Sequence, residues 1–296
     1  MLPPPFAAYI APARAFAQLW RLVLGLVLIA GVYFLWMALM GGLLWLVSGP
    51  EGMAPRLQTI GRGGDPVSLL LLLSTFAGMA LGVWGAARLL HKRGWRSLFG
   101  RPPVVLRDFV LGVGAMLVVG GGLSLLMLPF LPPLEPATSL RVWLMFLPLA
   151  LLGIGLQTGA EELVFRGYLQ QQLAARSSAP LVWMVLPSLL FGMAHFAPAE
   201  MGANAWLVVA ATGLFGLIAA DLTARTGALG LAWGLHFANN CLAILLVSSM
   251  AGLDGLALFQ LPEGANHADT LRPLLLIDMA LMGAVWAACR LWLRSR

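Results

Sequence analysis

The sequence predicts an all-α fold: a polytopic membrane helical bundle of about eight transmembrane helices, with residues 1–296 forming a single transmembrane domain. Hydrophobic residues make up 60% of the chain and charged residues only 10%, whereas soluble domains carry about 25% charged residues. The apolar stretches are continuous rather than alternating, which favours helices over a transmembrane β-barrel. A helical span takes about 20 apolar residues, so the chain has room for eight.

The expected spans follow in chain order from apolar runs and the breakers between them. The first run comes after a proline-rich, amphiphilic N-terminus and is too long for the apolar region of a signal peptide, so we expect it to be retained as a span. The eight runs are 19–47, 67–90, 104–131, 142–165, 180–197, 203–222, 227–249 and 271–293. Glycine, proline or polar residues separate them at 49–50, 61–66, 101–103, 132–133, 177–180, 197–198, 225–227 and 262–272.

The distribution of basic residues predicts an orientation. With the N-terminus inside, fourteen of the 18 Lys and Arg residues fall in inside segments, and only Arg56, Arg62, Arg141 and Arg272 fall outside. By the positive-inside rule both termini face the cytoplasm, and the alanine-, leucine- and arginine-rich composition favours a bacterial inner membrane. This positive-inside bias in a lipid bilayer explains the net charge of +6, so the basic residues do not indicate a nucleic-acid partner.

Almost no ionisable or amide side chain lies well inside a span in the first half of the chain, whereas the second half has Glu161, Glu162, Arg166, His195, His236, Asn239 and Asn240. Such groups are costly in hydrocarbon and are therefore commonly functional or paired. We expect them to locate the chemistry of the protein, and a structural ion pair between Glu162 and Arg166 is the alternative for those two residues.

Helix geometry permits these residues to share one site. Glu162 and Arg166 lie four residues apart on one face, whereas Glu161 points about 100° away and has no partner nearby in sequence. Glu161 and His195 lie equally far, about 25 Å, from the turn near residues 177–178, so an antiparallel hairpin places them at one depth. His236 lies closer to the turn that precedes it, so it reaches the same depth as Glu161 and His195 if the amphiphilic stretch 166–176 projects beyond the membrane.

Three motifs occur in order along these spans: Glu161-Glu162-xxx-Arg166, Phe191-xxx-His195 and His236-xxx-Asn240. Together they resemble the CPBP family (CAAX protease and bacteriocin-processing, also called Abi) of glutamic-type intramembrane endopeptidases, whose pattern is EExxxR, FxxxH and HxxxN. The flanking segments EELVFRGYLQQQL and SLLFGMAHF are also similar to the family. The resemblance covers about residues 141–250, which it marks as the catalytic core.

The resemblance implies an endopeptidase that cleaves a peptide or membrane-associated protein within the bilayer and needs no cofactor. In this family pattern Glu161 and His195 activate the attacking water, His236 and Asn240 stabilise the oxyanion, and Glu162 with Arg166 positions these groups. The chemistry is consistent with those roles, because peptide hydrolysis needs a base for water and donors for the developing negative oxygen. No oligomeric state is predicted.

Other functions remain open at this level. Glu161, His195 and His236 provide the number of ligands that a catalytic zinc ion uses, which would make the protease metal-dependent. A non-proteolytic scaffold or bacteriocin-immunity protein on the same fold is the main alternative, and a transporter is a third, although no inverted repeat is present. The sequence lacks His-Glu-x-x-His and the Gly-x-Ser-Gly and paired-aspartate motifs of other intramembrane proteases. Cys241 is a weaker candidate nucleophile, since Cys241 and Cys289 lie in apolar runs.

Overall fold

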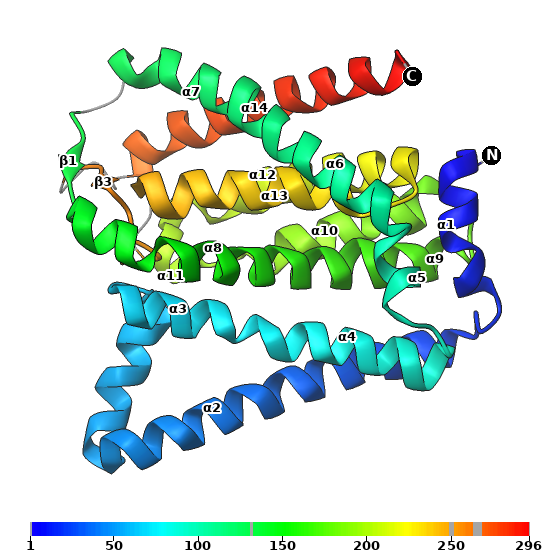
Figure 1. Cartoon of the computed structure of the whole chain (residues 1–296), viewed down its shortest axis with the longest axis horizontal. Helices are drawn as coiled ribbons and strands as arrows, with labels where there is room; N and C mark the ends of the chain where they lie inside the picture. The colour runs from blue at the N-terminus through cyan, green and yellow to red at the C-terminus, as the bar shows by residue number, and fades with distance from the viewer. Residues whose placement is uncertain (1, 131–132, 249–251, 263–267, 296) are drawn as a thin grey trace.

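The computed structural model describes residues 2–130, 133–248, 252–262 and 268–295 and consists of helices with one small sheet (Figure 1). In this part of the chain six helices are long and apolar enough to cross a membrane: Leu19–Arg62, Pro66–His91, Pro102–Phe130, Leu140–Ala174, Pro198–Thr226 and Leu271–Arg294. Two further apolar helices, Leu181–Met193 and Gly230–Leu246, are shorter. The expected polytopic helical bundle is confirmed, and the fifth and seventh apolar runs form these shorter helices.

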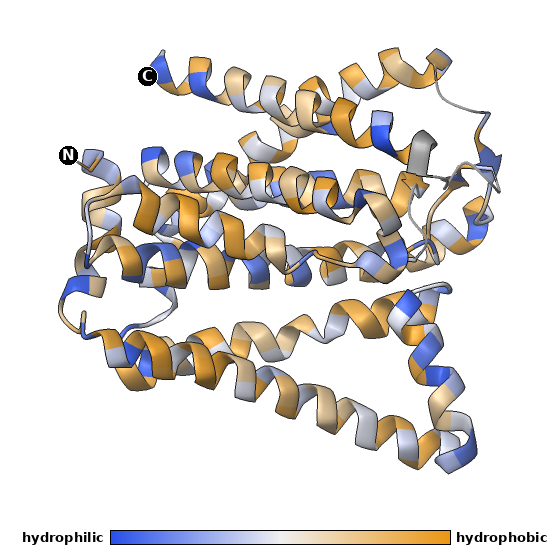
Figure 2. Cartoon of the chain, turned by 180° about the vertical axis from the view of Figure 1, so that it is seen from behind, coloured by the Kyte–Doolittle hydropathy of each residue, from blue (hydrophilic) through white to orange (hydrophobic). Residues whose placement is uncertain are grey.

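Hydrophobic residues run along the helices, and hydrophilic residues are frequent at the helix ends and in the connections (Figure 2). Many large apolar side chains point outward, including Val47 at 85% and Phe130 at 79% exposed. In a soluble protein such surfaces would aggregate, whereas in a bilayer the lipid tails cover them. The chain is an integral membrane protein.

Residues 19–91 form a layer of their own, whereas the short helix before them packs on the other helices. Helix α1 (Pro4–Arg14) precedes α2 (Leu19–Arg62), and α3 (Pro66–Ser74) and α4 (Phe76–His91) return along α2. The long helix α2 is broken at Gly49, whose φ of 67° only glycine adopts readily, so the breaker predicted at 49–50 separates two helical stretches at a kink. Figure 1 shows α2 and α4 beneath the remaining helices and diverging toward α3.

The rest of the chain builds the bundle that holds the polar residues. Its helices are α5 (Trp95–Phe99), α6 (Pro102–Ala115), π-helical η1 (Met116–Gly121), α7 (Gly122–Met127), η2 (Leu128–Phe130), α8 (Leu140–Glu162), π-helical η3 (Leu163–Gln170), α9 (Gln171–Ala174), η4 (Leu181–Val185), α10 (Leu186–Met193), α11 (Pro198–Met201), η5 (Gly202–Asn204), α12 (Ala205–Thr226), α13 (Gly230–Cys241), η6 (Leu242–Leu246) and α14 (Ala268–Arg294). A sheet of order β1-β3-β2 combines Glu135–Pro136, Phe259–Gln260 and Val247–Ser248. It ties the segment before α8 to the end of η6.

Glycines let α13 approach α6 closely. A Cβ atom built on Gly234 would lie 2.1 Å from the carbonyl oxygen of Phe109, and one on Gly230 would lie 2.2 Å from that of Val105. On the facing helix, a Cβ on Gly112 would lie 2.5 Å from the Leu231 carbonyl oxygen. Small residues favour such contacts between membrane helices. This seam fixes α13, which carries His236.

The amphiphilic stretch 166–176 is packed rather than projecting freely. Gln170, Gln171 and Gln172 are completely buried, and the Gln171 amide donates to the Ser97 carbonyl at 3.0 Å and accepts from Arg93. Helix α1 packs against α9 and against α12. Gln170 and Gln171 donate to backbone carbonyl groups of other segments, and Gln172 accepts from Arg176, so these hydrophilic residues form a buried polar layer rather than a solvent-exposed face.

Candidate active site

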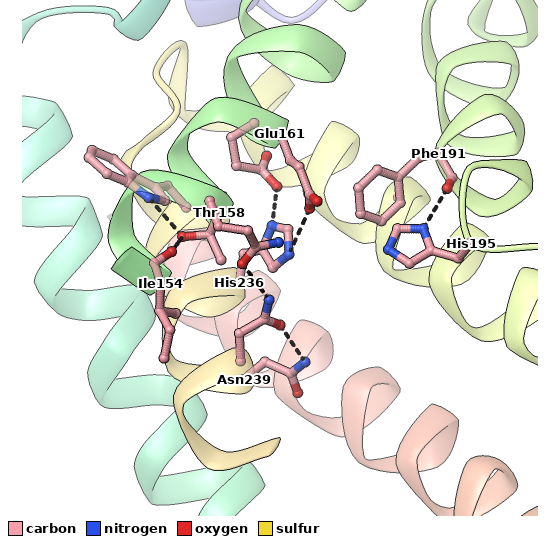
Figure 3. A network of polar contacts seen from close by, with 12 residues as sticks. Ile154, Thr158, Glu161, Phe191, His195, His236 and Asn239 are labelled. Atoms are coloured by element: carbon pink, nitrogen blue, oxygen red, sulfur yellow. Dashed lines mark hydrogen bonds and ion pairs between the residues drawn. The ribbon is translucent and has the colours of Figure 1, made fainter. Parts of the chain in front are cut away.

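The polar residues singled out in the sequence gather where the end of α8 faces α13 and the end of α10 (Figure 3). Glu161 and Glu162 are the last two residues of α8, and the chain continues as the π-helix η3. His236 lies in the middle of α13. His195 follows the end of α10 at Met193 by two residues, so it belongs to a turn and not to the helix expected there.

Glu162 and Arg166 form a buried ion pair, as their spacing predicts. The Arg166 Nη1 donates to the Glu162 Oε1 at 2.9 Å, and both side chains are at most 2% exposed. Arg166 also lies over the Phe191 ring, with 4.6 Å between the guanidinium carbon and the ring centroid. A buried guanidinium needs this carboxylate, because an unpaired charge away from water is very costly.

His236 joins the two glutamates. Its Nδ1 lies 2.9 Å from the Glu162 Oε1, and its Nε2 lies 3.4 Å from the Glu161 Oε2. The contact with Glu162 is a hydrogen bond, whereas the contact with Glu161 is at ion-pair distance only, and the buried Glu161 Oε2 has no hydrogen-bond partner among the described residues. A protonated His236 would give this group of four two negative and two positive charges, in a site where each member is 8% exposed or less. Glu161, which has no partner nearby in sequence, thus finds one 75 residues along the chain.

Glu161 and His195 line the same cavity, which has a volume of about 500 Å³. The opposite wall comes from α2 and α4, through Leu26, Ile29, Ala30, Tyr33, Phe34, Phe76 and Met79. Val164, Phe165, Phe191 and Ala194 complete the lining. The cavity is therefore apolar on the side of α2 and α4 and carries an acid and an imidazole on the side of α8 and α10.

The orientation of His195 is fixed by its own turn. Its Nδ1 lies 2.9 Å from the carbonyl oxygen of Phe191, and the two rings are in contact with centroids 4.8 Å apart. A carbonyl oxygen can only accept, so Nδ1 carries the proton and Nε2 presents a lone pair when the ring is neutral. Figure 3 shows the imidazole on the side of α10 that faces Glu161 and His236.

Asn240 lies one turn beyond His236 and contacts Gln157, a residue that the sequence analysis missed. The Asn240 Nδ2 donates to the Gln157 Oε1 at 2.9 Å, and the neighbouring Asn239 donates to the Asn240 Oδ1 at 3.4 Å. Gln157 precedes Glu161 by four residues on α8. Its position one turn before the acidic pair could have drawn attention to Gln157. Its partner Asn240 lies far along the chain, so the sequence alone does not show the contact.

Of the six predicted site residues, Glu161, Glu162, Arg166 and His236 are in direct contact, His195 shares the cavity with Glu161, and Asn240 lies one turn away. Within the described ranges, no three His, Cys, Asp or Glu side chains are arranged to hold a metal ion. The arrangement of Glu161, His195 and His236 as three ligands is thus not found there. Cys241 lies beside Asn240 in sequence and is half-buried.

Two comparisons with known proteins find relatives. Residues 139–242, which include all six predicted site residues, match the family described as Type II CAAX prenyl endopeptidase Rce1-like. Over 254 residues the chain is 27% identical to the Bacillus subtilis (strain 168) protein named Uncharacterized protein YyaK, and the match covers 84% of each chain. No solved structure matches the chain.

Proposed function

We propose that this chain, which carries an Rce1-like domain of the type II CAAX prenyl endopeptidases over residues 139–242, hydrolyses a peptide bond within the membrane through a water activated by Glu161 and His195. One observation carries the proposal: an acid and an oriented imidazole line one cavity whose other wall is apolar. The Rce1-like domain makes a CAAX-protease-type hydrolase the family-level activity. The glutamic mechanism and the substrate are the proposed part.

His195 is the proposed base for the attacking water. Because its Nδ1 donates to the Phe191 carbonyl, the free Nε2 of the neutral ring is the nitrogen that can take a proton. A water between this nitrogen and the Glu161 carboxylate would be held by two acceptors. Such placement directs the oxygen lone pair of the water toward a carbonyl carbon in the cavity.

The reaction then proceeds in two balanced steps. The water oxygen bonds to the carbonyl carbon, His195 takes the proton, and the carbonyl π electrons move onto oxygen to give a tetrahedral oxyanion. Collapse of the oxyanion breaks the C–N bond, and the protonated His195 returns its proton to the leaving amine. Glu161 stays a carboxylate throughout, orienting the water first and the imidazolium afterwards.

The remaining residues support this chemistry in the proposal. His236 and Asn240 stabilise the oxyanion, His236 through its positive charge beside Glu161 and Asn240 through the amide N–H that Gln157 does not use. Arg166 balances Glu162, and Glu162 in turn holds the Nδ1 side of His236. Loss of a single oxyanion donor lowers kcat by about 10²–10³ in other hydrolases.

The apolar wall favours a substrate that lies in the membrane. A peptide or membrane-associated protein with an apolar segment would pack on α2 and α4 while its scissile bond faced Glu161. Prenylated CAAX proteins, bacteriocin leaders and membrane-protein tails all have that character. We further propose a bacterial inner-membrane location with both termini in the cytoplasm, from the arginine distribution.

The test is substrate trapping with full-length protein. Cells that express Glu161→Gln or His195→Ala should accumulate an uncleaved substrate that co-purifies with the variant and can be identified by mass spectrometry. The purified variants should cleave this substrate about 10²–10⁴-fold more slowly than the wild type. Glu200→Gln, which neutralises an exposed acid on α11, is the matched control and cleaves normally. If Glu161→Gln retains cleavage, or keeps the wild-type cellular phenotype, the protein acts as a scaffold or immunity protein and the proposal fails.

A further inference from the structure

A second cavity, of about 410 Å³, lies at the end of the bundle formed by α5 and the start of α6. Its lining is Trp95, Arg96, Phe99, Gly100, Pro102, Val105, Leu106, Phe109 and Trp233, none of which lines the cavity of Glu161. Phe99 and Phe109 lie 5.7 and 4.9 Å from Trp233, centroid to centroid, so the inner wall is a row of aromatic rings. Arg96 is the one charged residue in this lining.

Two arginines lie at this apolar cavity: Arg96 is part of its lining, and Arg101 lies in sequence between the lining residues Gly100 and Pro102. Arg96 and Arg101 are exposed, and neither has an ion-pair or hydrogen-bond partner among the described residues. The segment 66–107 holds six basic residues and no Asp or Glu. Of these, Arg93 is buried with Ser97 and Gln171 as partners, and Arg107 pairs with Asp108, which leaves Arg96 and Arg101 at the cavity. Guanidinium groups at a membrane surface attract anionic lipids by about 1 kcal/mol each, which corresponds to about fivefold in affinity per arginine.

We propose that this cavity, the α5–α6 site, binds an anionic glycerophospholipid, with one acyl chain on the aromatic wall and the phosphate on Arg96 and Arg101. The apolar wall fits a hydrocarbon chain, and the two free guanidinium groups fit a phosphate with paired N–H donors. Trp95, 38% exposed at the mouth, matches the preference of tryptophan for the interface between lipid and water.

The α5–α6 site adjoins the helices of the candidate active site. The Trp233 indole N–H donates to the Thr158 Oγ1 at 3.2 Å, and a Cβ built on Gly159 would lie 3.0 Å from the Trp233 ring. Both residues precede Glu161 on α8, and Trp233 precedes His236 by three residues on α13. A bound chain therefore packs against a side chain that contacts α8 near Glu161.

Native mass spectrometry of the purified full-length protein tests the site. We expect phosphatidylglycerol to bind more tightly than phosphatidylcholine with the same chains, and the Arg96→Gln/Arg101→Gln variant to bind phosphatidylglycerol about 30-fold more weakly. Glycerol phosphate, which has no chains, should not bind. The Arg62→Gln/Arg141→Gln variant loses the same charge at the other end of the bundle and should bind as the wild type does.

A second measurement locates the acyl chain and does not depend on the arginine variant folding. In nanodiscs, phosphatidylglycerol brominated on its acyl chains should quench Trp95, so Trp95→Phe loses part of the quenching that the wild type shows. Equal affinity for the two headgroups, unchanged binding by the double arginine variant, or identical quenching in Trp95→Phe overturns the proposal. Displacement of the lipid by a cleaved peptide would overturn it as well, because the cavity would then belong to the substrate.

An independent observation concerns Gln157. Glu161 contacts His236, and one turn away Gln157 contacts Asn240, so α8 and α13 are joined by two successive polar contacts. Gln157 is 8% exposed and its Oε1 accepts one N–H of Asn240. This fixes which way the Asn240 amide faces, since an unheld amide can rotate.

We infer that Gln157 is a positioning residue that acts through Asn240, an inference that rests on the proposed function. Gln157→Leu should lower kcat by about tenfold to 100-fold with little change in KM, because the oxyanion donor is misplaced while substrate packing is intact. Gln157→Glu, which still accepts from Asn240, should restore most of the rate. In a double-mutant cycle, Gln157→Leu should cost nothing further once Asn240 is Leu.

The controls separate the two proposals. Thr212→Val removes a buried-side hydroxyl on α12 that bonds only its own helix at 2.8 Å, and should cleave normally. If Glu161→Gln is inactive while Gln157→Leu matches the wild type, or if the losses from Gln157→Leu and Asn240→Leu add, only the Gln157 inference fails. If Glu161→Gln is active, the proposed function fails. Gln157→Met serves as the apolar variant if Gln157→Leu does not fold, and the same outcomes decide.

Discussion

Replacing Arg166 by Met tests the electrostatics of the candidate site without an activity assay. Arg166 and Glu162 are a buried pair 2.9 Å apart, at 2% and 0% side-chain exposure. Methionine fills much of the same volume and keeps the apolar contact with Phe191, so the variant removes chiefly the charge. Glu162 is then left buried with His236 as its remaining cationic partner.

The expected cost is about 3–5 kcal/mol, the usual result of breaking a buried ion pair on one side. At about 2–4 °C per kcal/mol for a chain of this size class, the thermal midpoint should fall by roughly 6–20 °C. Adding Glu162→Gln to Arg166→Met removes the orphaned charge but keeps an oxygen that accepts from the His236 Nδ1. The double variant should therefore recover at least half of the loss.

Thermal unfolding of the purified protein in detergent, followed by tryptophan fluorescence and size-exclusion chromatography, measures both variants. Arg225→Met is the matched control, because its pair with Asp221 is partly exposed and its loss should cost about 1 kcal/mol or less. A midpoint for Arg166→Met within about 2 °C of the wild type would refute the reasoning. A double variant less stable than Arg166→Met would refute it equally.

Three further predictions concern the seam, a helix cap and metal dependence. Gly234→Ala should cost about 1–3 kcal/mol, seen as a lower thermal midpoint, because a Cβ would meet the Phe109 backbone, whereas Gly114→Ala on α6 has open space and should be neutral or slightly stabilising. Asp65→Ala should cost about 1 kcal/mol, because Asp65 caps α3 by accepting from Val67 and Ser68 at 3.0 Å. The hydrogen bonds from Ser68, chiefly that from its hydroxyl, hold the pKa of Asp65 below its usual range. The stabilisation by the ionised Asp65 is therefore fully present above the unfolded-state pKa and is lost as the pH falls through the lower folded-state pKa. Chelators should leave cleavage unchanged, and metal analysis of the active protein should find no stoichiometric ion; loss of activity restored by zinc would instead support the metal-dependent alternative.

Local pattern was sufficient for the parts of the fold that local chemistry decides. Each apolar run is mostly helical where the structure describes it, although the run 67–90 is divided between α3 and α4, and the pair Glu162–Arg166 formed at its predicted spacing even though η3 begins at Leu163. The ring contact between Phe191 and His195 also follows from four-residue spacing. These features depend on residues within one or two turns of each other, which a sequence displays directly.

Contacts between distant helices were not readable in the same way. Gln157 and Asn240 are 83 residues apart, and Glu161 and His236 are 75 apart, so their pairing depends on how closely α13 packs. That packing is set by backbone contacts at glycines, which carry no side-chain signal. The burial of residues 170–172 was missed for a similar reason, because the carbonyl groups to which Gln170 and Gln171 donate belong to other segments.

Charge balance connects the buried site with the proposed chemistry. The two carboxylates face the Arg166 guanidinium and the His236 ring, and protonation of that ring would bring the group to zero net charge, which lowers the cost of placing it away from water. When His195 takes a proton from water, the new imidazolium and the oxyanion again sum to zero. Each step then moves charge by a few ångströms within a neutral group instead of creating net charge in a medium that solvates it poorly. Removing Arg166, Glu162 or His236 alone breaks this balance in every state, so their substitution should lower stability and rate together, whereas His195→Ala should affect rate alone.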